Sequence, residues 1–96
     1  MSNTVRAAVV QTSPIMLDRQ ATTEKVCRLI DEAAGQGARV ILFPEALVPA
    51  YPRGLTFGTA VGSRSEEGRR AYAKYWEGAV EVPGPVTEQI GAAARQ

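Results

Sequence analysis

Two short apolar runs flanking one amphipathic stretch constrain the fold of this 96-residue chain more than any other feature. The runs cover residues 5–10 and 39–43, and each predicts a strand that is buried over most of its surface. Between them, apolar residues recur at helical spacing from residue 21 to residue 34. Strand, helix and strand in this order predict a βαβ unit with parallel strands.

The limits of these elements are marked by residues with strong local preferences. Asp18 is a good helix N-cap, because its carboxylate can accept hydrogen bonds from backbone N–H groups of the first turn. Gly35 and Gly37 predict the end of that helix, since glycine takes the left-handed C-cap conformation without a Cβ clash. Pro44 ends the second strand because it has no N–H to donate to the ladder.

The second half of the chain predicts a long loop and two further helices. Five proline or glycine residues between positions 46 and 62 indicate the loop. Ser63 and Glu66 have the spacing of a capping box, which predicts the start of a helix. The run 82–85 breaks that helix, and Pro85 suits the first position of the next one, where its missing N–H has no partner to lose.

The predicted architecture is incomplete as a domain. Only two strands are evident, both would have an open edge, and a parallel sheet needs cover on both faces. We therefore expect residues 1–96 to form one part of a single, larger α/β domain.

Composition excludes several classes of function. Hydrophobic residues make up 45% of the chain and the net charge is +1, so there is no basic surface for nucleic acid or an anionic membrane. No stretch resembles a signal peptide or a transmembrane helix, and the single cysteine allows no disulfide framework, which together predict a cytoplasmic protein. The chain has no histidine, so we expect no His/Cys metal site within it.

Glu45 is the residue best placed for chemistry. It follows a predicted buried strand and a proline, and ligands of open α/β sheets gather beyond the carboxyl ends of the strands. A carboxylate there would be partly desolvated, which suits a general base. The alternative is a turn carboxylate that only caps backbone N–H groups, and position alone slightly favours that alternative.

The other candidates are weaker. Residues 35–37, Gly-Gln-Gly, could be taken for a phosphate-binding loop. However, they end a helix rather than begin one, and they lack the third glycine of a dinucleotide fingerprint. Cys27 lies within an amphipathic helix and has no histidine to activate it, so packing is the favoured role over a nucleophile. Aromatic residues at helical spacing could form a ligand platform, but a core or interface role is more common; they are Tyr72, Tyr75 and Trp76.

An ordered series of motifs resembles the nitrilase superfamily of carbon–nitrogen hydrolases. The series covers essentially the whole chain, and the later motifs are similar to those of true nitrilases in order and approximate spacing. They are Ala7-Ala8-Val9-Val10-Gln11, Phe43-Pro44-Glu45-Ala46, Tyr51-Pro52-Arg53-Gly54, Phe57-Gly58, Val61-Gly62-Ser63-Arg64, Gly68-Arg69, Tyr75-Trp76 and Val82-Pro83-Gly84-Pro85. Pro-Glu alone is a weak signal, whereas the ordered series is specific.

The resemblance implies the N-terminal portion of an α-β-β-α sandwich and a Glu–Lys–Cys catalytic set. Glu45 matches the glutamate, whereas the family's lysine and cysteine would lie beyond Gln96. Tyr51 falls in a segment that borders the substrate pocket in nitrilase-like enzymes. The implied activity is hydrolysis of a small-molecule nitrile to a carboxylic acid and ammonia, without metal or organic cofactor, in a homo-oligomer. An amidase, a cyanide-degrading enzyme and an inactive fragment or interaction module are the alternatives.

Overall fold

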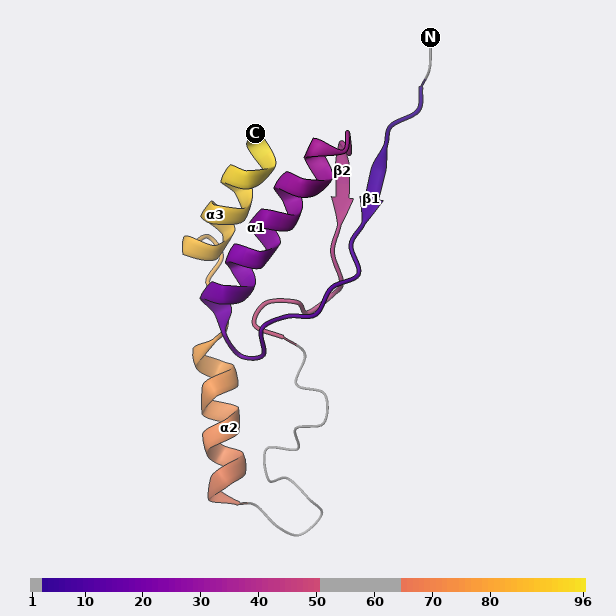
Figure 1. Cartoon of the computed structure of the whole chain (residues 1–96). Helices are drawn as coiled ribbons and strands as arrows, with labels where there is room; N and C mark the ends of the chain where they lie inside the picture. Colours follow the sequence, from indigo (N-terminus) through magenta and orange to yellow (C-terminus); the bar gives the residue numbers. More distant parts are fainter. Residues whose placement is uncertain (1–2, 51–64) are drawn as a thin grey trace.

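The computed structural model of the chain describes residues 3–50 and 65–96. In this part of the chain the elements follow the order β1 (Ala7–Val9), α1 (Arg19–Gly35), β2 (Val40–Leu42), α2 (Glu66–Glu77) and α3 (Pro85–Arg95) (Figure 1). The two strands form one parallel sheet. The predicted α/β class and the βαβ unit are confirmed.

The register of the sheet brings the carboxyl ends of both strands to the same level. Ala8 pairs with Ile41, and the N–H of Val10 donates to the carbonyl of Leu42 at 2.9 Å as the last backbone bond between the strands. The loops after β1 and β2 therefore leave the sheet side by side, as the trace in Figure 1 shows. In open parallel sheets this is the end at which ligands bind.

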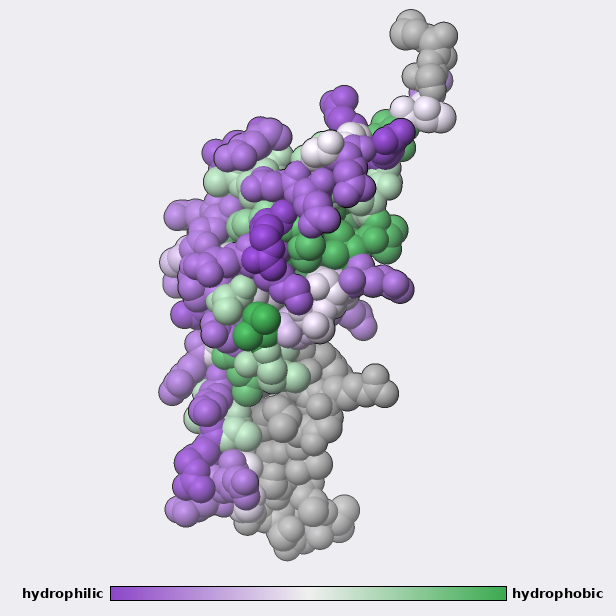
Figure 2. Space-filling view, in the orientation of Figure 1, coloured by the Kyte–Doolittle hydropathy of each residue, from purple (hydrophilic) through white to green (hydrophobic). Residues whose placement is uncertain are grey.

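The strands are covered on one face only, so the prediction that they are buried over most of their surface is wrong. Ala8 and Ile41 are half-buried on the side of α1. Val9, Val40 and Leu42 point the other way and are 74%, 58% and 62% exposed. The reason is that α1 crosses a single face and no described element lies on the other. Figure 2 shows hydrophobic surface in the region of the strands.

Helix α1 begins and ends where its sequence predicts. The Asp18 carboxylate accepts from the N–H of Ala21 at 2.9 Å, which satisfies one of the unpaired donors of the first turn. The helix ends at Gly35, and Gly37 has a φ of +92°, the left-handed region that glycine tolerates best.

A small hydrophobic core joins α1, α3 and the segment after β2. Its buried members are Val26, Ile30 and Leu47, and half-buried side chains from β2, the following loop and α3 pack around them, namely Ile41, Phe43, Val48, Ile90 and Ala93. The predicted apolar stripe of α1 therefore points at this core. From α3, Ile90 and Ala93 pack against the same core.

The start of α2 differs from the prediction, whereas the start of α3 agrees with it. Ser65 is the N-cap of α2, and its hydroxyl accepts from the N–H of Gly68 at 3.0 Å. Glu66 is thus the first helical residue and not the third, and Ser63 lies outside the described residues. Pro85 occupies the first turn of α3, directly after the Gly84 N-cap.

The chain is too extended for a self-contained domain of its length. Its radius of gyration is 16.9 Å and its principal extents are 63 × 24 × 18 Å. A compact domain of this length has a radius of gyration of about 12–13 Å. The difference reflects α2, which projects away from the body formed by α1, α3 and the sheet (Figure 1). None of the described helices is long and apolar enough to cross a membrane.

Candidate active site

Glu45 lies on a sharp turn that the core holds on both sides. Phe43, two residues before it, packs against the core, and Leu47, two residues after it, is buried there. Ala46 has a φ of +52°, so the chain reverses its direction directly after Glu45. Left-handed backbone at a non-glycine residue is retained only where the surrounding structure fixes it. The turn is therefore set by its two anchors.

The loop that carries Glu45 is tied to the loop that follows β1. The N–H of Leu17 donates to the carbonyl of Pro49 at 3.1 Å. Ala50, at the end of this described segment, is 2% exposed. The two loops at the carboxyl end of the sheet are thus joined to each other as well as to the core.

The Glu45 side chain is not part of this packed base. Residue 45 is exposed, so the expectation of a partly desolvated carboxylate is wrong for the described part of the chain. Its carboxylate also forms no hydrogen bond or ion pair with any described residue. The alternative role, capping of backbone N–H groups, therefore has no support among these residues. The backbone at Glu45 is therefore fixed by its neighbours, while the carboxylate oxygens are accessible to a ligand or to further protein.

The other predicted site residue, Tyr51, lies outside the described residues. Within residues 3–50 and 65–96, no group of three histidine, cysteine, aspartate or glutamate side chains lies close enough to hold a metal ion. The Glu45 turn is therefore the part of the predicted site that can be described.

Cys27 lies in a partly buried position between α1 and α3. It is half-buried in α1, and its Sγ lies 3.5 Å from the carbonyl oxygen of Gln89 in α3. Burial, followed by the negative charge of Asp31, raises the pKa of the Cys27 thiol above its ordinary value. Both effects disfavour the thiolate, which is the nucleophilic form. The favoured interpretation of Cys27 as a packing residue agrees with this environment.

Alkylation of Cys27 by iodoacetamide at pH 8 is expected to be several-fold slower in the folded chain than in urea. The reason is that the raised pKa lowers the thiolate fraction at this pH and the α1–α3 contact restricts access. Asp31→Asn should recover part of the rate by removing the smaller of the two effects. Mass spectrometry of timed samples gives the rates, and equal rates in buffer and urea would contradict the assignment.

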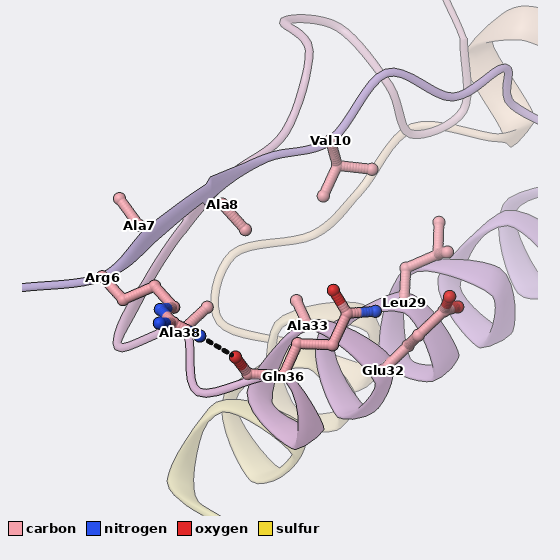
Figure 3. Close-up of a pocket in the computed structure, with 9 residues that line it drawn as sticks. All are labelled: Arg6, Ala7, Ala8, Val10, Leu29, Glu32, Ala33, Gln36 and Ala38. Carbon is pink, nitrogen blue, oxygen red and sulfur yellow. Dashed lines mark hydrogen bonds between the residues drawn. The ribbon is translucent and has the colours of Figure 1, made fainter.

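Two hollows border the sheet in the described part of the chain, and Glu45 lines neither of them. One, of about 300 Å³, is lined by β1 and α1 and includes Arg6, Gln36 and Ala38 at the amino ends of the strands (Figure 3). There the Arg6 guanidinium donates to the carbonyl of Gln36 at 2.9 Å. A second, of about 350 Å³, lies between α1, β2 and α3. Both hollows run along the strands, since Val10 lines the first and Phe43 lines the second.

The aromatic residues of α2 are largely on the surface. Trp76 is 71% and Tyr72 is 47% exposed, and the Tyr72 and Tyr75 rings lie 6.5 Å apart between centroids. They do not form a core in the described part of the chain. An interface role for them stays a prediction.

Sequence reasoning missed two buried threonines of α1. Thr22 and Thr23 are fully buried, although both interrupt the apolar stripe. The Thr23 hydroxyl donates to the carbonyl of Arg19 within the helix at 2.7 Å, whereas Thr22 bonds the loop after β1. The signal that could have found them is their position one turn after the N-cap, where a hydroxyl can reach the backbone that enters the helix.

Comparison with known proteins agrees with the predicted fold class. The profile of the Carbon-nitrogen hydrolase family matches residues 6–96. An aliphatic nitrilase of Sinorhizobium fredii (strain HH103) is 50% identical over 91 residues, which are 95% of this chain and 30% of the relative. A bifunctional nitrilase/nitrile hydratase, NIT4B, of Nicotiana tabacum is 47% identical over 95% of this chain and 26% of its own length. Nitrilase 3 of Arabidopsis thaliana is 46% identical over 97% and 27%.

The fold and the site together define an α/β chain with a candidate acid–base carboxylate at the carboxyl end of a parallel sheet. The chain belongs to the carbon–nitrogen hydrolase (nitrilase) family, because the family profile covers nearly all of its residues. It spans about a quarter to three tenths of the length of the curated relatives that it matches.

Proposed function

We propose that the protein acts, at the full length of its relatives, as a nitrilase that converts a nitrile to a carboxylic acid and ammonia. In this proposal Glu45 is the general base, and residues 1–96 form one part of a single catalytic domain. The lysine and the nucleophilic cysteine of the set would come from beyond Gln96. Tyr51 would border the substrate pocket, and the complete protein would form a homo-oligomer.

The observation that carries the proposal is the position of Glu45. Its carboxylate lies at the carboxyl end of the parallel strands, on a turn anchored by Phe43 and Leu47, and it has no partner among the described residues. A general base needs a fixed backbone and free oxygens that can reach the proton to be removed. Family membership and the nitrilase names of the relatives add independent support.

The chemistry asked of Glu45 is proton transfer in two steps. In the first, the carboxylate takes the proton of the cysteine thiol as the sulfur attacks the nitrile carbon, and passes it to the nitrile nitrogen to give a covalent thioimidate. In the second, it takes a proton from the water that attacks this intermediate and passes it to the nitrogen, so that the C–N bond breaks, ammonia leaves and a thioester remains. A second water then releases the acid from the thioester. A lysine ammonium would stabilise the charge that develops on nitrogen and oxygen.

A substrate panel tests the reaction class. The complete-length protein should release ammonia from an aliphatic or aromatic nitrile faster than from the matching amide or from cyanide. Free acid and amide should both be quantified, because one relative is a bifunctional nitrilase/nitrile hydratase. A preference for the amide or for cyanide would assign the protein to the alternative branches, an amidase or a cyanide-degrading enzyme.

The isolated 96-residue chain is expected to release no ammonia from any of these substrates. Cys27 is half-buried with a raised pKa, so the chain offers no activated thiol to attack a nitrile. Ammonia measured against a heat-denatured sample decides this. Turnover by the chain alone, retained in Cys27→Ser, would mean that it hydrolyses nitriles by a route other than the thioimidate.

A further inference from the structure

We propose that Thr22 is a positioning residue for Glu45, acting through the two loops at the carboxyl end of the sheet. The inference rests on the proposed function of Glu45. Thr22 does not touch Glu45, so its effect would be exerted through backbone contacts.

The Thr22 hydroxyl fixes the loop after β1 from inside the protein. Its side chain is fully buried, and its hydroxyl accepts from the N–H of Ile15 and donates to the carbonyl oxygen of Ile15, both at 3.0 Å. The same carbonyl also accepts from the N–H of Asp18 at 3.0 Å. One hydroxyl thus satisfies both backbone groups of Ile15 and locks the turn that leads into α1.

The turn that the Thr22 hydroxyl fixes also holds the loop that carries Glu45. Leu17, between Ile15 and Asp18, has a φ of +56°, and its N–H donates to the carbonyl of Pro49 at 3.1 Å. A left-handed conformation at leucine is strained and persists only while the surrounding contacts impose it. Loss of the Thr22 hydroxyl would release that restraint, and the Leu17–Pro49 bond would loosen.

The loop of Glu45 would then depend on its hydrophobic anchors alone. Phe43 and Leu47 would still hold the turn against the core, so the site would persist in a less ordered form. A general base displaced by a fraction of an ångström or more loses rate in the chemical step, while binding of a small substrate changes less. The expected signature is therefore a loss in kcat with KM nearly unchanged.

Thr23 is a matched control for Thr22. Both are fully buried threonines on adjacent positions of α1, and Thr→Val removes the same hydroxyl from each with little change in shape. Among the described residues, the hydroxyl of Thr23 bonds only the carbonyl of Arg19, in its own helix. A general effect of deleting a buried hydroxyl would appear in both variants, and a positioning effect in Thr22→Val only.

In the complete-length enzyme, Thr22→Val should lower kcat for nitrile hydrolysis by about 10- to 100-fold. KM should change by less than about 2-fold, and Thr22→Ser, which keeps the hydroxyl, should restore most of the rate. Thr23→Val should keep kcat within about 2-fold of the unsubstituted enzyme. If Thr22→Val does not fold, Thr22→Cys is the second variant. Because a thiol is a weak donor, Thr22→Cys should give a kcat between those expected for the valine and serine variants. A kcat equal to that of Thr22→Ser would overturn the proposal.

Hydrogen exchange measured by mass spectrometry separates this inference from the function of Glu45. Thr22→Val should speed exchange several-fold in peptides that cover residues 13–18 and 43–50, and Thr23→Val should not. Equal effects of the two valine variants on exchange and kcat, or no effect of Thr22→Val, would overturn the proposal. If Glu45→Gln proves fully active, the proposed function fails, while the exchange result still decides whether Thr22 holds the loop.

Discussion

Glu45→Gln in the complete-length enzyme is expected to lower kcat for nitrile hydrolysis by about 10²- to 10⁴-fold. Glutamine keeps the size of the side chain but cannot accept a proton near neutral pH. The loss should lie toward the upper end of this range, because the carboxylate is asked to act in both thioimidate formation and its hydrolysis. Steady-state ammonia release gives kcat and KM.

The substitution should leave folding intact, which makes the result interpretable. Residue 45 is exposed and its carboxylate has no partner among the described residues, so the change to an amide removes no described contact. Glu81→Gln is a suitable control, since it makes the same chemical change at an exposed position in the loop before α3. Near-normal turnover of Glu45→Gln, with a normal circular dichroism spectrum, would remove the role assigned to Glu45.

Ile30→Ala is expected to lower the free energy of unfolding of the 96-residue chain by about 2–5 kcal/mol. Ile30 is 6% exposed and, among the residues that the structure describes, forms the centre of the core with Val26 and Leu47. Typical domains are stable by about 5–15 kcal/mol, so the loss would remove much of the stability of so small a core. Urea unfolding followed by circular dichroism at 222 nm measures it.

Leu42→Ala is the matched control for the core prediction. It also truncates a branched aliphatic side chain, but Leu42 is 62% exposed on the uncovered face of the sheet. Its expected effect is less than about 1 kcal/mol, mostly from strand propensity. Equal losses in the two variants would mean that the uncovered face is buried in solution, for example against a second copy of the chain.

Local features of the fold could be predicted from the sequence, because they depend on contacts within a few residues. The Asp18 cap, the end of α1 at Gly35 and the start of α3 at Pro85 all follow from such short-range preferences. Burial of the strands could not be predicted, because an apolar side chain is buried only if another element covers it. Val9 and Leu42 have the residue types of a buried strand and are nonetheless exposed.

The position of Glu45 in the fold could be predicted from the sequence, but the exposure of its side chain could not. Glu45 lies where the strand–proline pattern puts it, at the carboxyl end of β2, but its exposure depends on what packs over the turn. Thr22 could not be recognised, because its importance comes from a bond to Ile15 that exists only in the folded loop. Contacts between loops have no periodic pattern in the sequence, unlike the contacts along a helix or strand.

The projecting α2 also affects how this chain behaves in solution. A 10.3 kDa chain with a longest dimension of 63 Å has a larger hydrodynamic radius than a sphere of the same mass. On a gel-filtration column calibrated with globular standards, the monomer will elute early and can be mistaken for a dimer. Multi-angle light scattering, which measures mass without assuming a shape, is the appropriate way to count its subunits.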